Sequence, residues 1–320
     1  MKYKVFWLFL LVSILVVVVG IFYRQRRFTA PTNLKEVDSR YLGPPDSVTG
    51  TASSSFGQNS GLTLRLDLDT YLRVDNEVLQ SGPVIVAIVA PDNKLGEYSS
   101  DLVKLAAITN PEVTKWVGFS SFATLTSKLS DPTSLQELRD AGISGFTYNS
   151  EGQHTPRAEM QLLDSDGSDN IVAQFARLTT QFGFQSFWVP SNANSMINGL
   201  STQALQQLLS AGLSGVVIQE QRQIEASCPE AEANNVNLTI SHLHSVLPNL
   251  KIGVQLMTDR CKTANSFAEK SCGQAASSSS WTACGSFLDF LQPQPTILSL
   301  WTPTRQNDTE LLDFVNFVRP

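Results

Sequence analysis

Apolar runs recur along the chain and alternate with segments that have helical periodicity. The clearest runs are VIVAIVA (84–90), KWVGFSSF (115–122), ISGFTYN (143–149), FQSFWVP (184–190), LSGVVIQ (213–219), KIGVQLM (251–257) and TILSLWT (296–302). LTLRLDL (62–68) is a weaker candidate for an eighth strand. Near-continuous apolar strands separated by helices are typical of parallel βαβ units that are buried on both faces.

Capping residues mark the ends of two predicted helices. Asp131 precedes Pro132, and that helix is expected to stop at Gly142; Ser201 begins a helix that is expected to stop at Gly212. Eight βα units within residues 61–320 predict an α/β protein with a (β/α)8 barrel of the TIM type. An open, doubly wound sheet is the alternative, although no G-x-G-x-x-G turn follows its first strand.

A sequence repeat supports the barrel. AGISGFTYNSE (141–151) aligns without gaps to AGLSGVVIQEQ (211–221), and the offset of 70 residues corresponds to two βα units. The two strands are therefore expected to be equivalent. We expect Gly145 and Gly215 to leave room inside a crowded barrel.

The repeat also predicts a polar site. Asn149 aligns with Gln219 and Glu151 with Gln221, so each strand ends in two polar side chains on one face. If this face points into the barrel, the four side chains converge at the carboxyl ends of the strands, where barrel proteins carry their sites. The alternative is that they only hydrogen-bond the loop backbones at the rim.

The amino-terminal region predicts a membrane anchor. Residues 5–23 carry no charge and are dominated by Leu, Val, Ile and Phe, and as a helix they nearly span a hydrocarbon core of about 30 Å. No convincing small-x-small cleavage site follows, which favours an uncleaved single-pass helix over a signal peptide. Residues 1–4 are then a short tail, and the Ser-, Gly- and Pro-rich residues 24–60 a flexible linker to the barrel domain at 61–320.

The cysteines favour an oxidising compartment. Cys228, Cys261, Cys272 and Cys284 are even in number and too widely spaced for a zinc site, so we predict two disulfides, Cys228–Cys261 and Cys272–Cys284. This indicates a cell-membrane protein with an extracytoplasmic barrel. Basic residues flank the span on both sides, so the positive-inside rule does not fix its orientation.

The charge distribution argues against a nucleic-acid partner. Of the 23 basic and 29 acidic residues, seven basic and two acidic residues lie within the first 40, so the remainder carries an excess of 11 acidic residues. Such a surface repels phosphates. No P-loop, H-E-x-x-H or G-x-S-x-G motif occurs, so neither a metal nor a cofactor is expected, and the sequence leaves the oligomeric state open.

Glu151 is the strongest candidate for acid or base chemistry, because a partly buried carboxyl at a barrel mouth can have its pKa tuned by burial. A glycosidase needs a second carboxylate about 5 to 10 Å away. Asp259 is better placed for this role than Glu220, whose parity along the strand points it away from the axis. Glu225 is a further alternative.

Aromatic and polar residues near the strand ends suggest a carbohydrate ligand. Trp188 and Trp301 each precede a proline at the end of a strand, where an indole can stack on a sugar ring, although core packing is the commoner role of tryptophan. The candidate ligand-binding residues are Tyr148, Asn149, His154, Trp188, Gln219, Gln221 and Trp301.

YNSEGQHTPRAE, with the later IQEQ, KIGVQLMTD and SLWTP, resembles a largely uncharacterised group of bacterial exported proteins expected to be (β/α)8 barrels, and more distantly glycoside hydrolases. The resemblance covers most of residues 80–320 and implies roles for Tyr148, Glu151, Thr155, Pro156, Gln219, Gln221 and Trp301. Asn149 stands where an acid is usual, which removes one carboxylate.

The function expected from these observations is that of a membrane-tethered, extracytoplasmic barrel that acts on or binds cell-surface carbohydrate; if it is an enzyme, it is expected to be glycoside hydrolase-like. The alternatives are a non-catalytic barrel that binds a glycan or peptide at the same mouth, and a structural envelope protein.

Overall fold

Eight parallel strands form a closed barrel, in which each strand pairs with its neighbours in chain order and β8 returns to β1. The strands are β1 (Thr63–Asp67), β2 (Val84–Ala90), β3 (Val113–Phe119), β4 (Ile143–Ser150), β5 (Gln185–Pro190), β6 (Gly215–Gln219), β7 (Lys251–Met257) and β8 (Ile297–Trp301). The pairing of Leu64 with Leu298 closes the ring, which excludes the open doubly wound sheet. The weakest predicted strand, β1, is confirmed with the other seven.

The computed structural model describes residues 61–79, 82–90, 95–151, 154–163, 170–191, 193–274, 281–301 and 308–319. The predicted tail, membrane anchor and linker at residues 1–4, 5–23 and 24–60 lie outside these ranges. None of the helices within the ranges is both long enough and apolar enough to cross a bilayer.

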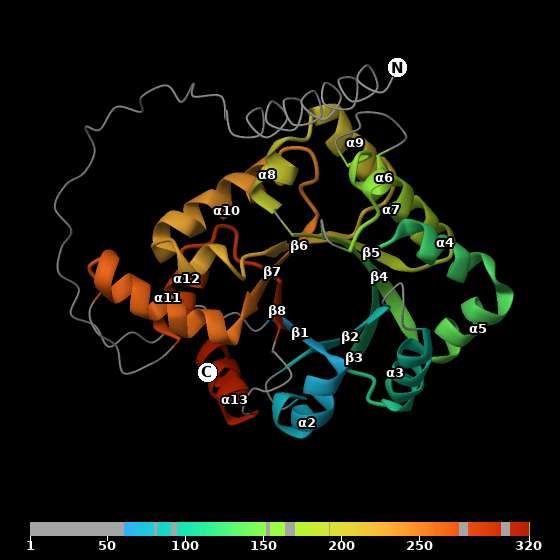
Figure 1. Ribbon diagram of the computed structural model, residues 1–320, viewed down its shortest axis with the longest axis horizontal. Helices are drawn as coiled ribbons and strands as arrows, with labels where there is room; N and C mark the ends of the chain where they lie inside the picture. The colour runs from blue at the N-terminus through green and yellow to red at the C-terminus, as the bar shows by residue number, and fades with distance from the viewer. Residues whose placement is uncertain are drawn as a thin grey trace, which may run out of the picture. The chain divides into compact units, whose positions relative to one another are not determined.

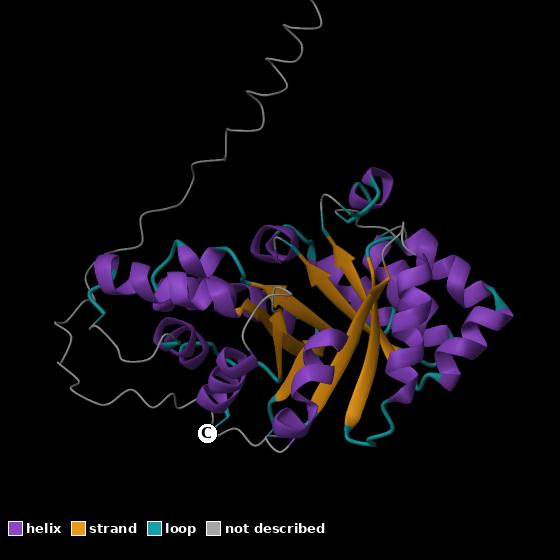
Figure 2. Ribbon diagram, turned by 60° about the horizontal axis from the view of Figure 1, so that its bottom comes forward, coloured by secondary structure: helices purple, strands orange, loops and turns teal. Residues whose placement is uncertain are grey.

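Helices surround the strands, as Figure 1 shows looking along the barrel and Figure 2 from the side. They are α2 (Leu68–Leu79), α3 (Leu95–Ala107), α4 (Phe122–Ser130), α5 (Pro132–Asp140), α6 (Arg157–Met160), α7 (Ile171–Gln181), α8 (Ala193–Asn198), α9 (Thr202–Ser210), the 3-10 turn η2 (Gln223–Glu225), α10 (Pro229–His244), α11 (Thr258–Ser271), α12 (Thr282–Asp289) and α13 (Asp308–Val318). Their apolar faces pack on the outer side of the strands and make up the larger of two hydrophobic clusters.

The predicted helix boundaries are confirmed. Asp131 accepts a hydrogen bond from the Ser134 amide at the start of α5, and Ser201 accepts one from the Ala204 amide at the start of α9. Gly142 and Gly212 follow these helices with φ of 74° and 82°, a left-handed conformation that glycine adopts without strain. The third strand ends three residues earlier than predicted because Ser121 caps α4.

A second, smaller apolar cluster fills the inside of the barrel. It consists of Ile85, Ala87, Trp116, Phe187 and Ile297, and we refer to these five residues as the interior floor. The rings of Trp116 and Phe187 lie 4.1 Å apart between centroids.

Glycines in the two repeated strands make this packing possible. A Cβ atom at Gly145 would lie 2.9 Å from Trp116 Nε1, and one at Gly215 would lie 2.4 Å from Phe187 Cε1. The expectation that these two glycines leave room inside the barrel is therefore confirmed.

Two disulfides are present, but the predicted pairing is wrong. Cys228 bonds to Cys272 and Cys261 to Cys284. The reason is α11, which occupies Thr258–Ser271 and contains Cys261 in its first turn. At 1.5 Å per residue it holds Cys261 and Cys272 about 16 Å apart along its axis. Cys272 at the end of α11 therefore meets the start of α10, while Cys261 in its first turn meets α12.

Candidate functional site

The candidate site is the inner surface of the barrel on the carboxyl side of the interior floor. Strand residues alternate between the inner and outer faces. Gly118 shares the inner face of β3 with Trp116 of the interior floor. A Cβ atom at Gly118 would lie 2.8 Å from Thr147 Oγ1 and 3.3 Å from Asn149 Nδ2, so these two side chains lie on the same face. Thr147 and Asn149 on β4 therefore face the axis, as the repeat predicted.

An arginine that the sequence analysis did not single out lies inside the barrel. Arg65 on β1 is only 8% exposed. Its Nη1 donates to Ser299 Oγ on β8 at 2.8 Å and to Gln255 Oε1 on β7 at 3.3 Å. The Ser299 hydroxyl also donates to Gln255 Oε1, at 3.3 Å. We call these three residues the Arg65 network; it joins the first strand of the barrel to the last two.

The Arg65 network points from the interior floor toward the mouth. Gln255 and Ser299 each lie two residues beyond the paired Gly253 and Ile297 in the carboxyl direction of their strands. Burial lowers the pKa of the Arg65 guanidinium to about 10, and the nearby Asp67 carboxylate partly offsets this effect. The side chain is therefore charged at neutral pH.

The polar ends of β4 and β6 meet, as the repeat predicted. Gln219 Nε2 donates to Glu151 Oε1 at 3.4 Å and to the Val189 carbonyl oxygen at 3.3 Å. Glu151 is half-buried, whereas Gln219 and Asn149 are 7% and 8% exposed. We use the term mouth for Asn149, Glu151, Gln219 and Trp301, which share the inward faces of their strands or directly follow them.

Thr155 fixes the backbone around Glu151 at the end of β4. Thr155 Oγ1 donates to the Asn149 carbonyl oxygen at 3.1 Å and accepts from the Glu151 amide at 2.9 Å. The Glu151 carbonyl also accepts from the Thr155 amide at 2.8 Å. These contacts fix the backbone on both sides of the Glu151 side chain, and Pro156 then precedes α6.

Two of the predicted ligand-binding residues are not at the mouth. Tyr148 is fully buried, and its hydroxyl donates to Glu159 Oε2 at 3.0 Å. Trp188 is 1% exposed, and its Nε1 donates to Ser150 Oγ at 2.9 Å. Both alternate with inward-facing neighbours, so they point outward to the helices. Placing them at the mouth was wrong.

The remaining predicted residues lie at or near the carboxyl side of the barrel. Trp301 is 47% exposed and shares the strand face of Ser299. Gln221 follows β6 and is half-buried, and the His154 side chain is exposed. Asp259 is exposed in the first turn of α11. The roles assigned to these residues stay predictions.

Glu220 faces away from the barrel axis, as its parity predicted. It is 1% exposed, and the buried Glu232 on α10 lies close enough to influence its pKa. Burial, and then the charge and hydrogen bond of Glu232, raise the pKa of Glu220 to about 9. Glu225 pairs with Arg260 instead. Neither glutamate is part of the mouth.

Glu159 on α6 is a buried carboxylate that sequence reasoning missed. Its two oxygens accept from the Phe122 amide at 2.8 Å, the Ala123 amide at 3.2 Å, the Ser121 hydroxyl at 3.2 Å and the Tyr148 hydroxyl. The carboxylate thus satisfies the free amides at the start of α4, where the helix dipole favours a negative charge. Burial and Glu159 both raise the pKa of Tyr148.

We expect Tyr148→Phe to lower the free energy of unfolding by about 1 kcal/mol through the lost hydrogen bond, and Glu159→Ala by about 2 to 3 kcal/mol, because four donors lose their acceptor. Neither substitution should change ligand binding at the mouth. Urea unfolding of both variants measures the effect. If Tyr148→Phe lost ligand binding without any change in stability, Tyr148 would have to be counted as a ligand-binding residue.

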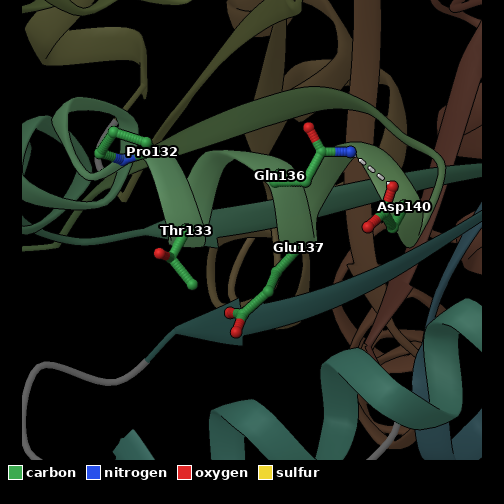
Figure 3. Close-up of a pocket in the computed structure, with 5 residues that line it drawn as sticks. All are labelled: Pro132, Thr133, Gln136, Glu137 and Asp140. Carbon is green, nitrogen blue, oxygen red and sulfur yellow. Dashed lines mark hydrogen bonds between the residues drawn. The ribbon is translucent and has the colours of Figure 1, made fainter.

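A shallow depression on the outer helical layer is separate from the mouth. Pro132, Thr133, Gln136, Glu137 and Asp140, all exposed residues of α5, line it (Figure 3). Gln136 Nε2 donates to Asp140 Oδ1 at 2.7 Å there. Across the part of the chain that the structure describes, no group of three or more His, Cys, Asp or Glu side chains is arranged to hold a metal ion.

The fold and site together define a (β/α)8 barrel with a polar, partly charged interior on its carboxyl side. No protein-family model and no curated protein matches the sequence. Similar solved structures include a ligand-free TrpA mutant of tryptophan synthase from M. tuberculosis, with 9% identity, a TM-score of 0.46 and coverage of 82% of this chain and 93% of that one.

Two further structures show a comparable likeness. Dihydropteroate synthase from Thermus thermophilus has 12% identity and a TM-score of 0.44, over 81% of this chain and 93% of that one. The spore coat polysaccharide biosynthesis protein spsE from Bacillus subtilis has 13% identity and a TM-score of 0.41, over 82% and 68%. Similarity at this level assigns neither a reaction nor a ligand to this chain.

Proposed function

We propose that the mouth binds cell-surface carbohydrate, and that the protein is a membrane-tethered, extracytoplasmic glycan-binding barrel. The observation that carries this proposal is a set of buried polar atoms around the axis that have no hydrogen-bond partner among the described residues: Arg65 Nε, Thr147 Oγ1 and Asn149 Oδ1. Buried polar groups in native proteins are almost always satisfied. A polyhydroxylated ligand that enters from the carboxyl side supplies both donors and acceptors.

The composition of the mouth favours a sugar over an apolar ligand. Asn149 and Gln219 are amides that can orient hydroxyl groups, and Glu151 is an additional acceptor. Trp301 exposes almost half of its surface at the carboxyl end of β8, where an indole can stack on a sugar ring. Val89, which shares the strand face of the inward residues Ile85 and Ala87, is 50% exposed, so solvent reaches this end of the barrel.

The location proposed for the protein rests on two supports. The two disulfides are typical of an oxidising compartment outside the cytoplasm. The uncharged apolar run at residues 5–23 has the composition and length of a membrane span.

Binding without hydrolysis is favoured by the positions of the carboxylates. A glycosidase needs a second carboxylate facing Glu151 across the ligand. Asp67, at the end of β1, accepts hydrogen bonds from the Thr70 amide at 2.8 Å and the Thr70 hydroxyl at 2.7 Å, which suits a helix cap. Asp259 is exposed on α11, and Glu220 faces the helices.

The test is an affinity measurement on the full chain in nanodiscs, with an array of envelope glycans as probes. We expect Glu151→Gln, Gln221→Ala and Trp301→Ala each to weaken binding by about 10- to 100-fold, because each removes a hydrogen bond or a stacking surface. Melting temperatures should change little, since these residues lie at strand ends.

Phe290→Ala is the matched control, because Phe290 is a 43% exposed aromatic at the end of α12. It should leave binding unchanged. Loss of thermal stability without loss of binding in Glu151→Gln, Gln221→Ala and Trp301→Ala would favour the alternative of a structural envelope protein. Release of reducing ends that disappears in Glu151→Gln would instead show a hydrolase.

A further inference from the structure

Arg65 is a buried cation whose hydrogen bonds go to neutral side chains. Desolvating a guanidinium costs several kcal/mol, which proteins usually offset with a directly paired carboxylate. Here Nη1 is bound by Ser299 and Gln255, which carry no charge. The nearby carboxylate, Asp67, stabilises the charge from a distance while its oxygens accept from Thr70.

One donor of the guanidinium, Nε, has no acceptor among the described residues. Nε is buried, whereas Nη1 on the opposite edge makes both hydrogen bonds. The edge formed by Nε and Nη2 is the one that binds a carboxylate side-on through two parallel hydrogen bonds. The Arg65 network therefore fixes the guanidinium through Nη1 and leaves the buried Nε–H on the other edge without an acceptor among the described residues.

Two further polar side chains lie inside the barrel, on β4. They pack closely against Gly118 on β3, where a Cβ atom would lie 2.8 Å from Thr147 Oγ1 and 3.3 Å from Asn149 Nδ2. Thr147 Oγ1 and Asn149 Oδ1 also lack partners among the residues described. A hydroxyl and an amide thus border the axis on β4, across the barrel from β1.

We propose that Arg65 binds the carboxylate of an acidic sugar, such as a uronic acid, through its Nε and Nη2 edge. This inference rests on the proposed glycan-binding function and names the ligand class for the same site. The sugar ring then lies toward the mouth, where Asn149, Gln219 and Glu151 meet its hydroxyls and Trp301 its face.

The charge of the domain sets a limit on the ligand. The chain beyond residue 40 carries an excess of 11 acidic residues, so a densely charged polyanion is repelled at long range. A single carboxylate that is buried against one guanidinium is screened much less by salt than surface charges are. We therefore expect sparsely carboxylated glycans to bind better than heavily sulfated or phosphorylated ones.

The experiment compares saccharides that differ only in the carboxylate, using the full chain in nanodiscs. The probes are a hyaluronan tetrasaccharide and tetragalacturonate, each against its carboxyl-reduced form, in which CH2OH replaces the carboxylate. Affinities are measured by calorimetry. We expect the acidic form of at least one pair to bind at least tenfold more tightly, and Arg65→Met to remove the difference.

Lys115→Met is the matched control for the loss of a buried cation. Lys115 is 8% exposed on β3, on the outer face, where its Nζ donates to the carbonyl oxygens of Ala141 and Ala106. This variant should keep the preference for the acidic form. If Lys115→Met removed the preference as fully as Arg65→Met, the proposal would be overturned.

A second measurement uses the unmutated protein, so that it does not depend on how Arg65→Met folds. The Nε–H resonance of Arg65, assigned by its absence in Arg65→Lys, should shift on titration with acetate and stay unchanged with acetamide. A shift in Nε–H without binding of any saccharide would support the carboxylate site and overturn the glycan function. Equal binding of acidic and reduced saccharides, with no shift, would overturn the carboxylate site alone. Absence of both responses would overturn the two proposals together.

Discussion

Replacing Gly215 with alanine is expected to lower the free energy of unfolding by about 3 kcal/mol, because overpacking a rigid core forces side chains and backbone to move. The added Cβ atom would lie 2.4 Å from Phe187 Cε1 and 2.7 Å from the Lys251 carbonyl oxygen. Phe187 cannot retreat freely, since its ring packs against Trp116 at 4.1 Å. Urea unfolding measures the change.

Two further glycines provide a graded comparison. A Cβ atom at Gly253 would lie 3.1 Å from Ile297 Cβ and Val217 Cγ2, a tight contact that a small adjustment relieves. At Gly61 nothing lies within 4 Å. Stability should therefore fall in the order Gly61→Ala, Gly253→Ala, Gly215→Ala. Equal losses for the three variants would show that the floor is more adaptable than its contacts indicate.

Replacing Glu220 with glutamine is expected to stabilise the protein at alkaline pH and to remove part of its pH dependence. Burial and Glu232 raise the pKa of Glu220 from its ordinary 4.5 to about 9. A folded-state pKa above the unfolded value means that the contribution of this carboxyl to stability is fully present below about pH 4.5 and is lost progressively toward pH 9. For each pH unit in this window, the free energy of unfolding falls by about 1.4 kcal/mol for the one proton involved.

At pH 8 the gain from Glu220→Gln should be about 2 to 4 kcal/mol, and near pH 4.5 it should vanish. Chemical unfolding of wild type and variant across this range gives the difference directly. Glu225→Gln is the matched control, because its partner Arg260 is 42% exposed and such pairs contribute less than about 1 kcal/mol. A gain from Glu220→Gln that was the same at every pH would contradict the raised pKa.

The barrel could be predicted because seven of the eight strands are nearly continuous in apolar residues, and because caps such as Asp131 and Ser201 mark two of the intervening helices. The side-chain directions on β4 were predictable only in part. Alternation makes Asn149 face the axis, and it equally makes Tyr148 face outward. Tyr148 was nevertheless counted among the site residues because it stands next to Asn149 and Glu151 in the sequence. Trp188 was placed at the mouth because it precedes a proline at the end of a strand, although alternation also sends it outward.

The rest of the site required three-dimensional structure. Arg65, Gln255 and Ser299 lie up to 234 residues apart in the sequence, and they meet only because the first strand pairs with the last. A local signal existed: each is an isolated polar residue in an apolar strand, and Arg65 shares a strand face with Asp67. The disulfide pairing was missed because α11 separates two cysteines that are close in sequence.

The contacts of Arg319, just after α13, have a consequence for how the chain is assembled during translation. Its guanidinium donates to the carbonyl oxygens of Leu62 and Pro83, which precede β1 and β2. Strand β1 pairs with β2 on one side and with β8 on the other, and β8, like Arg319, is synthesised late. One edge of β1 therefore stays without its native partner until nearly the whole domain has been synthesised. Since long-range pairing slows folding and open strand edges invite association, this edge of β1 is exposed to association until β8 and α13 have been made.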